Sequence, residues 1–236
     1  MKFEQLEINQ QLIDQTIQQG FTDLTPIQEQ CIPEIIKSKD VLGQAETGSG
    51  KTIAFCIPIL EKIKKNQGIQ TLVLTPTREL CIQVSDVFKT FGKTLGVKTT
   101  SIYGGVNIKP QFKNLKNSEV IVATPGRMLD HIRRGTVDLT KVRFLILDET
   151  DKMLEMGFID DVEQIISHTP RNRQTLMFSA TIIRSFKKLM NKHLKDPVVI
   201  KTKSKVDKSK LDQIFYDIHN KNDKFSLLIH LLKNDT

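Results

Sequence analysis

The sequence is poor in the residues that build metal centres. Its three cysteines stand far apart, and none has a second cysteine or a histidine at metal-ligand spacing. The five histidines are equally scattered and form no HExxH pair that would place two imidazoles on one helix face. We therefore expect no metal-hydrolase centre, and buried core thiols at Cys31, Cys56 and Cys81.

Long apolar runs are also missing. No stretch approaches the ~18 apolar residues that a membrane-spanning helix needs. The N-terminal segment, MKFEQLEINQQ, lacks the apolar core of a secretion signal. These absences predict a cytoplasmic protein, or a nuclear or nucleolar one if the organism is a eukaryote.

Acidic residues are outnumbered, because 35 Lys and Arg stand against 27 Asp and Glu in a chain of 236 residues. The net charge of +8 suits a polyanionic partner such as nucleic acid. Lysine-rich surfaces also serve solubility alone, so charge by itself leaves both explanations open. The length fits one large α/β domain, or one domain and a fragment of another.

Seven short runs rich in β-formers recur along the chain, and amphipathic stretches separate most of them. Several runs are apolar throughout, which is typical of strands covered by helices on both faces. The pattern predicts an α/β fold with a doubly wound, mostly parallel sheet. The expected strands are residues 40–43, 71–75, 97–103, 119–123, 143–148, 174–179 and 197–200.

A polar cluster follows five of these strands, where ligands bind in doubly wound sheets. The first cluster is a P-loop, AETGSGKT at 45–52, although Ala45 stands where the general pattern has glycine. Its amides would cradle phosphates at a helix N-terminus, Lys51 would bridge the β and γ phosphates, and Thr52 would hold magnesium. The predicted phosphate-binding residues are Ala45, Thr47, Gly48, Ser49, Gly50, Lys51 and Thr52.

The motif DETD at 148–151 supplies carboxylates for the same chemistry. We assign Asp148 to the magnesium ion and Glu149 to the attacking water. Read without the P-loop, an acidic helix start would be the better explanation of the motif. Together with Lys51, these two carboxylates form the predicted catalytic set.

The ordered set of motifs resembles the DEAD-box ATP-dependent RNA helicases. AETGSGKT is followed by PTREL at 76–80, GG at 104–105, TPGR at 124–127, DETD, and SAT at 179–181. Gly20-Phe21 and the TPIQ segment at 25–28 are similar to that family's Q-motif, with Phe3 at the position of its upstream aromatic residue. The resemblance extends from residue 3 to about residue 200 and implies a RecA-like, helicase ATP-binding domain.

The resemblance also implies roles for single residues. Gln28 would hydrogen-bond the adenine edge and Phe21 would stack on the base, so that the site selects ATP. Read alone, these residues are as well explained by a helix-surface glutamine and a core aromatic residue. Asp151, Ser179 and Thr181 would couple the nucleotide site to RNA opening, whereas a helix N-cap is the alternative for the last two.

The remaining motifs would grip the sugar-phosphate backbone of one RNA strand. Each combines a backbone approach point with a hydroxyl or guanidinium group, and such contacts are blind to base sequence and weaken with salt. Each also has a structural explanation as a capped turn or a loop. The predicted RNA-binding residues are Thr77, Arg78, Gly104, Gly105, Thr124, Gly126 and Arg127.

The chain departs from the family at Thr150, where the name-giving motif has alanine, and its β-branched hydroxyl could disturb packing against the SAT motif. A second RecA-like domain, which supplies arginine fingers in this family, has no counterpart of its HRxGR-type motif here. We predict a Q-motif region at 1–28, a RecA-like domain at 29–200, a linker at 201–210 and the start of a second domain at 211–236, with a strand at 214–218 and a helix at 225–232. By itself the chain should bind ATP and RNA weakly, hydrolyse ATP very slowly and unwind no duplex.

Three functions remain open at this point. The first is a monomeric RNA helicase that uses ATP and Mg²⁺ and needs the second domain for full activity. The second is a non-catalytic clamp that binds ATP and RNA, which the intact Lys51, Asp148 and Glu149 disfavour. The third is a DNA-translocating relative, which the Q-motif and PTREL disfavour.

Overall fold

The structure is a computed structural model that describes residues 1–202, 214–218 and 220–234. The chain divides into two compact units, Met1–Lys203 and Ser204–Thr236. Among the described residues, no helix is both long enough and apolar enough to cross a membrane.

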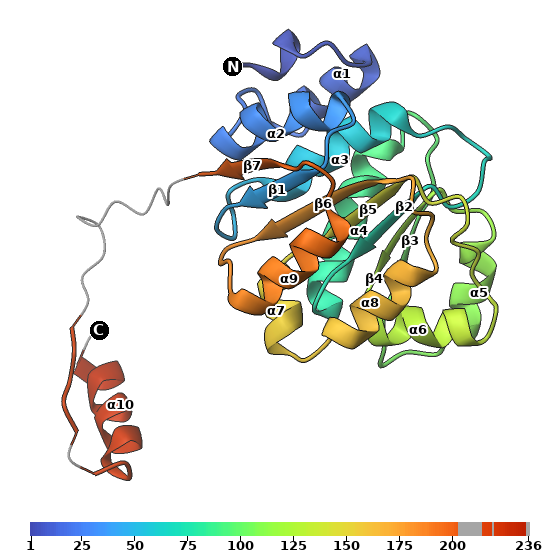
Figure 1. Cartoon of the computed structure of the whole chain (residues 1–236). Helices are drawn as coiled ribbons and strands as arrows, with labels where there is room; N and C mark the ends of the chain where they lie inside the picture. Colours follow the sequence, from blue (N-terminus) through green and yellow to red (C-terminus); the bar gives the residue numbers. More distant parts are fainter. Residues whose placement is uncertain (203–213, 219, 235–236) are drawn as a thin grey trace. The chain divides into compact units, whose positions relative to one another are not determined.

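A seven-stranded parallel sheet forms the centre of the first unit (Figure 1). The strand order is β3-β4-β2-β5-β6-β1-β7, and every neighbouring pair is parallel. This confirms the predicted α/β fold, and the seven strands predicted between residues 40 and 200 are all present, with ends shifted by at most two residues. The strands are β1 (Val41–Gln44), β2 (Thr71–Leu74), β3 (Thr99–Ile102), β4 (Val120–Ala123), β5 (Phe144–Leu147), β6 (Gln174–Ser179) and β7 (Val198–Lys201).

Helices cover both faces of the sheet, which explains why its strands are apolar throughout. On one face Phe55, Phe88 and Phe178 pack together with ring centroids 5.2 to 6.1 Å apart. Helices α5 to α9 pack on the other face around a second core. The three cysteines are buried, as predicted. The helices are the short η1 (Phe3–Gln5), α1 (Gln10–Gln18), α2 (Pro26–Ile36), α3 (Lys51–Lys62), α4 (Arg78–Gly92), α5 (Lys109–Leu115), α6 (Pro125–Arg133), α7 (Thr150–Glu155), α8 (Ile159–Ser167) and α9 (Arg184–His193).

The parallel arrangement brings the carboxyl ends of the strands to one rim. The P-loop follows β1, PTREL follows β2, GG follows β3, TPGR follows β4, DETD follows β5 and SAT overlaps the end of β6. Residues far apart in the sequence therefore meet at one edge of the sheet.

The second unit contains one described helix, α10 (Asp223–Asn234), which confirms the helix predicted at 225–232. The strand predicted at 214–218 is not formed, because a strand needs a partner and no described segment pairs with these residues. The linker predicted at 201–210 overlaps the end of β7 and, beyond Thr202, lies outside the described residues.

Candidate functional site

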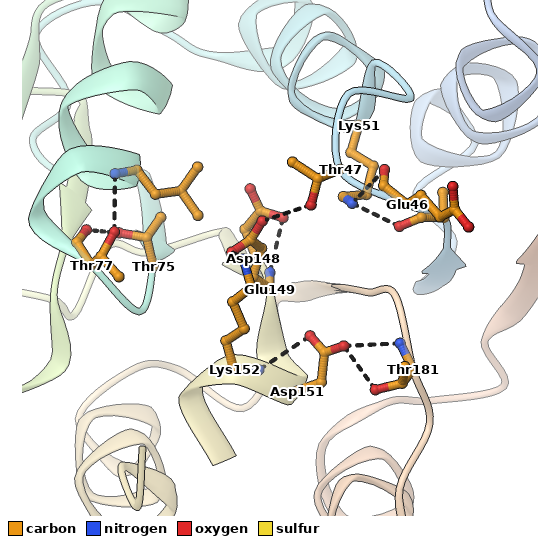
Figure 2. A network of polar contacts seen from close by, with 12 residues as sticks. Glu46, Thr47, Lys51, Thr75, Thr77, Asp148, Glu149, Asp151, Lys152 and Thr181 are labelled. Atoms are coloured by element: carbon orange, nitrogen blue, oxygen red, sulfur yellow. Dashed lines mark hydrogen bonds and ion pairs between the residues drawn. The ribbon is translucent and has the colours of Figure 1, made fainter. Parts of the chain in front are cut away.

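The P-loop curls around the amino group of its own lysine. Lys51, the first residue of α3, donates from Nζ to the carbonyl oxygens of Ala45 at 2.7 Å and Glu46 at 2.9 Å (Figure 2). Gly48 and Gly50 have φ values of 81° and 92°, in the left-handed region that glycine adopts without strain. Burial lowers the pKa of Lys51, and the nearby DETD carboxylates oppose this shift. The loop is thus held closed by a cation that also faces three carboxylates.

Gln28 lies behind the P-loop rather than on the helix surface. Its side chain is buried, its Oε1 accepts from the Thr25 backbone N–H at 2.9 Å, and its Nε2 donates to the Gly50 carbonyl at 3.1 Å. A Cβ at Gly50 would lie 2.5 Å from Gln28 Nε2. The surface alternative for Gln28 is therefore wrong, and its side chain braces the P-loop directly.

Phe21 is not a core aromatic residue. Its side chain is 42% exposed, and its ring centroid lies 6.4 Å from that of Phe91. A partly exposed ring can contact a further planar group, which is a property that base stacking requires.

The DETD motif places two different carboxylates at the rim. Asp148 is almost fully buried, and burial raises its pKa to about 6 although Lys51 opposes the shift. Glu149 adopts left-handed backbone angles of 48° and 49°, an uncommon conformation for a residue other than glycine. Its carboxylate accepts from Thr47 Oγ1 at 3.3 Å and forms an ion pair with Lys152 at 2.8 Å (Figure 2). A strained backbone and two side-chain contacts thus aim Glu149 at the P-loop.

Asp148 and Thr52 fit a magnesium ion by their chemistry. Mg²⁺ is a hard cation that is usually held by one or two carboxylates together with substrate phosphates. Asp148 is a buried carboxylate whose raised pKa reports that its charge is poorly compensated by the protein alone. Thr52 follows Lys51 and is partly buried at the start of α3.

Asp148→Asn is expected to raise the melting temperature of the nucleotide-free protein at pH 8. The Asp148 carboxyl group titrates near 3.8 when unfolded and near 6 when folded, so its ionised form costs folding free energy above pH 6. The cost is at most about 3 kcal/mol, shrinks between pH 6 and pH 4, and vanishes at lower pH where both states are protonated. Calorimetry across this range tests the effect, and a gain that does not change with pH would contradict it.

Asp151 contacts the SAT motif. Its Oδ2 accepts from the Thr181 backbone N–H and from Thr181 Oγ1, both at 2.9 Å, and Ser179 Oγ donates to the Thr181 carbonyl at 2.6 Å. Burial raises the pKa of Asp151, but hydrogen bonds from Thr181 and Ser179 outweigh it and lower the pKa overall. The N-cap alternative is wrong, because α9 begins later, after Ile183.

Thr150 joins the ends of two strands instead of disturbing them. Its hydroxyl lies 3.1 Å from the Leu147 carbonyl and 3.2 Å from the Phe178 carbonyl. The β5–β6 ladder ends at the pair Leu147 and Met177, because the chain turns away at Glu149. The Phe178 carbonyl thus lies one step beyond the ladder, and the Thr150 hydroxyl supplies a donor there.

Six of the seven predicted RNA-binding residues line one cavity of about 570 Å³, and Gly105 is not among its lining residues. Arg78 lies over the Tyr103 ring at 5.0 Å, and a Cβ on Gly105 would be 3.8 Å from the Arg78 guanidinium. Thr77 also caps α4 by accepting from the Leu80 N–H, so its structural explanation holds as well. The residues that line this groove are Pro76, Thr77, Arg78, Gly104, Thr124, Gly126, Arg127, Asp130, Met156 and Phe158.

The predicted RNA-binding set lacks four of the lining residues, namely Pro76, Asp130, Met156 and Phe158, and it also lacks a buried brace behind them. Met156 and Phe158 follow the DETD helix and add an apolar wall, but nothing in their spacing pointed to the groove. His131 is fully buried, and its Nε2 lies 3.0 Å from Gln111 Oε1, which also accepts from Arg127 at 3.4 Å. Arg127 also donates to the carbonyl of Val106, which follows the GG motif, at 2.9 Å. These bonds fix Arg127 of the TPGR motif against the segment that follows the GG motif.

Comparisons with known proteins agree with this geometry. A family model described as DEAD/DEAH box helicase matches residues 25–189. The DEAD-box ATP-dependent RNA helicase CshA of Geobacillus kaustophilus is 45% identical over 233 residues, which cover 98% of this chain and 50% of that protein. The crystal structure of a DEAD box protein from Methanococcus jannaschii superposes with a TM-score of 0.84 at 42% identity, covering 99% of this chain and 64% of that one.

A second solved structure, a hypothetical ATP-dependent RNA helicase from Sulfolobus tokodaii, gives a TM-score of 0.78 at 39% identity. The matched region covers 83% of this chain and 57% of the Sulfolobus tokodaii chain. The chain thus spans about half to two thirds of the length of the relatives it matches.

Proposed function

Because the chain belongs to the DEAD/DEAH box helicase family, we propose that it binds ATP with Mg²⁺ and single-stranded RNA, as part of an ATP-dependent RNA helicase. One observation carries the proposal. The P-loop lysine, the two DETD carboxylates and most residues that line the groove of about 570 Å³ lie in segments that directly follow the carboxyl ends of the strands of one sheet.

ATP binding would exchange one set of contacts for another. Lys51 would leave the carbonyls of Ala45 and Glu46 for the β and γ phosphates, while the loop amides receive the phosphate oxygens. Magnesium, held by Asp148 and Thr52 with the nucleotide, would neutralise charge on the phosphates. Glu149, already directed toward the P-loop by Thr47, would orient the attacking water.

RNA would occupy the groove through its backbone. Thr77, Arg78, Thr124 and Arg127 offer hydroxyl and guanidinium donors, which recognise phosphates without reading bases. The Asp151–Thr181 contact is our candidate for the link between the two ligands, because it ties the DETD helix to the segment after β6. A second RecA-like domain would add arginine fingers, worth about 10³ to 10⁵ in rate.

Phosphate release with and without RNA tests the function. We expect slow, weakly stimulated hydrolysis by the 236-residue chain, and strong stimulation when a second RecA-like domain is joined to it. RNA and ATP binding without hydrolysis by the joined protein would instead support the clamp. Preference for single-stranded DNA over RNA would support a DNA-translocating relative.

Gln28→Ala is expected to reduce the preference for ATP over GTP by about tenfold or more. We propose that the remaining N–H and lone pair of the Gln28 amide pair with the adenine edge, and a polar site rejects a base that leaves such groups unpaired. Competition titrations of both nucleotides measure the ratio. Gln30→Ala is the control, since Gln30 is exposed on the same helix; equal loss of ATP and GTP affinity by Gln28→Ala would show a purely structural role.

A further inference from the structure

Helices α4 and α5 pack against β3 at the margin of the sheet (Figure 1). A second cavity, of about 360 Å³, opens there among side chains of these elements. Three lysines line it: Lys89 from α4, Lys98 before β3, and Lys113 from α5. The other lining residues are four hydroxyl residues and two asparagines, and none is acidic. The cavity therefore presents donors and positive charge, which suit an anion rich in oxygen atoms.

The edge of β3 adds unpaired backbone groups to this cavity. Val120 N–H donates to the Lys98 carbonyl at 3.2 Å, and Thr124 N–H donates to the Ile102 carbonyl at 2.9 Å. Backbone groups alternate in direction along a strand, so those of Thr99 and Ser101 point away from β4. Within the described residues, no strand pairs with β3 on that side.

The lysines are free to meet a ligand. Lys98 and Lys113 are exposed, and Lys89 pairs with Asp86 at 2.9 Å in a contact whose side chains are 49% and 60% exposed. Exposed ion pairs contribute about 0 to 1 kcal/mol, so a phosphate can replace Asp86 at little cost. Lysines at an edge strand also discourage pairing with strands of other molecules, which would explain their presence without any ligand.

The cavity is close to the proposed RNA groove. Ser101 lines the cavity and Gly104 lines the groove, so three residues of chain, at most about 11 Å, separate the nearest lining residues, and six residues, at most about 22 Å, separate Lys98 from Gly104. About three stacked nucleotides span the shorter distance and about six span the longer one. Helix α5 connects the two places, since Gln111 holds Arg127 of the groove and Lys113 lines the cavity.

We propose that this lysine cavity is a second RNA-backbone site, which receives the strand as it leaves the groove past Gly104. The inference rests on the proposed function, because an RNA strand already held in the groove reaches the cavity at high effective concentration. An acidic protein segment could use the same donors, but nothing among the described residues brings one there. RNA is thus the ligand that the observations favour.

The test compares single-stranded RNAs of two lengths by fluorescence anisotropy. An oligouridylate of about 6 nucleotides fills the groove, and one of about 12 also reaches the cavity. The variant K89A/K98A/K113A should bind the short RNA like the unaltered chain and the long RNA about 10- to 100-fold more weakly at low salt. Its slope of log affinity against log salt should fall by about 2 for the long RNA, since each lost phosphate contact removes about 0.7.

The control variant K37A/K39A/K195A removes three exposed lysines from the amino end of β1, about 24 Å away across five strand spacings. It should bind both RNAs like the unaltered chain. Equal weakening by both triple variants would overturn the proposal in favour of general charge attraction. An equal loss of affinity for short and long RNA in K89A/K98A/K113A alone would also overturn the proposal. Polyglutamate that binds the unaltered chain tightly but displaces neither RNA would overturn it as well. Failure of the unaltered chain to bind any RNA would instead refute the proposed function.

Discussion

Replacing Lys51 with alanine is expected to weaken ATP binding by about 10² to 10⁴. Two charge-assisted hydrogen bonds to phosphates would be lost, each worth about 1.5 to 3 kcal/mol. The change also removes the cation that faces Asp148, Glu149 and Asp151, so their negative charge would repel the triphosphate. Titration with a fluorescent ATP analogue measures the loss.

Lys62→Ala is the matched control. Lys62 ends the same helix and likewise donates to a backbone carbonyl, that of Ile35 at 2.8 Å, but it lies at the opposite end of α3 from the P-loop. We expect its ATP affinity to stay within about twofold of the unaltered chain. If Lys51→Ala bound ATP as well as Lys62→Ala does, the P-loop assignment would be untenable.

Glu149→Gln is expected to slow ATP hydrolysis by about 10² to 10⁴ while ATP binding persists, which is the range for loss of a general base. The amide keeps the shape of the side chain and can still accept from Thr47, but it cannot take a proton from water. The substitution also breaks the ion pair between Glu149 and Lys152. Because the Lys152 side chain is half exposed, we expect this loss to have little effect on stability.

Single-turnover conversion of radiolabelled ATP resolves such slow rates, and a nucleotide titration confirms that binding survives. Glu155→Gln is the control, because Glu155 is an exposed acid at the other end of α7. Hydrolysis by Glu149→Gln at the rate of Glu155→Gln would assign the water to another group.

The fold was predictable because its strands are short and apolar on both faces. Runs such as Phe144–Leu147 can only be buried between two helical layers, and a parallel sheet then brings every following loop to one rim. The failed strand at 214–218 shows the limit of this reasoning, since apolar alternation does not provide a pairing partner. Strand formation depends on residues that local sequence does not contain.

The candidate site was predictable where residues act through a linear motif and not where they act through packing. The P-loop and DETD could be placed from spacing alone. The burial of Gln28 and the exposure of Phe21 could not, since each depends on how the N-terminal segment lies against the rest of the unit. His131 carried no signal, because its partner Gln111 belongs to a different helix.

Thr150 illustrates how a single hydroxyl group can alter hydration. With alanine at this position, the Phe178 carbonyl would need a water molecule or would remain unpaired in a buried place. The threonine hydroxyl supplies a donor to this carbonyl itself, so the joint between the DETD helix and β6 needs no water at that point. Serine is another small residue whose hydroxyl can donate in the same way, whereas alanine offers no donor to the two strand ends that Thr150 joins.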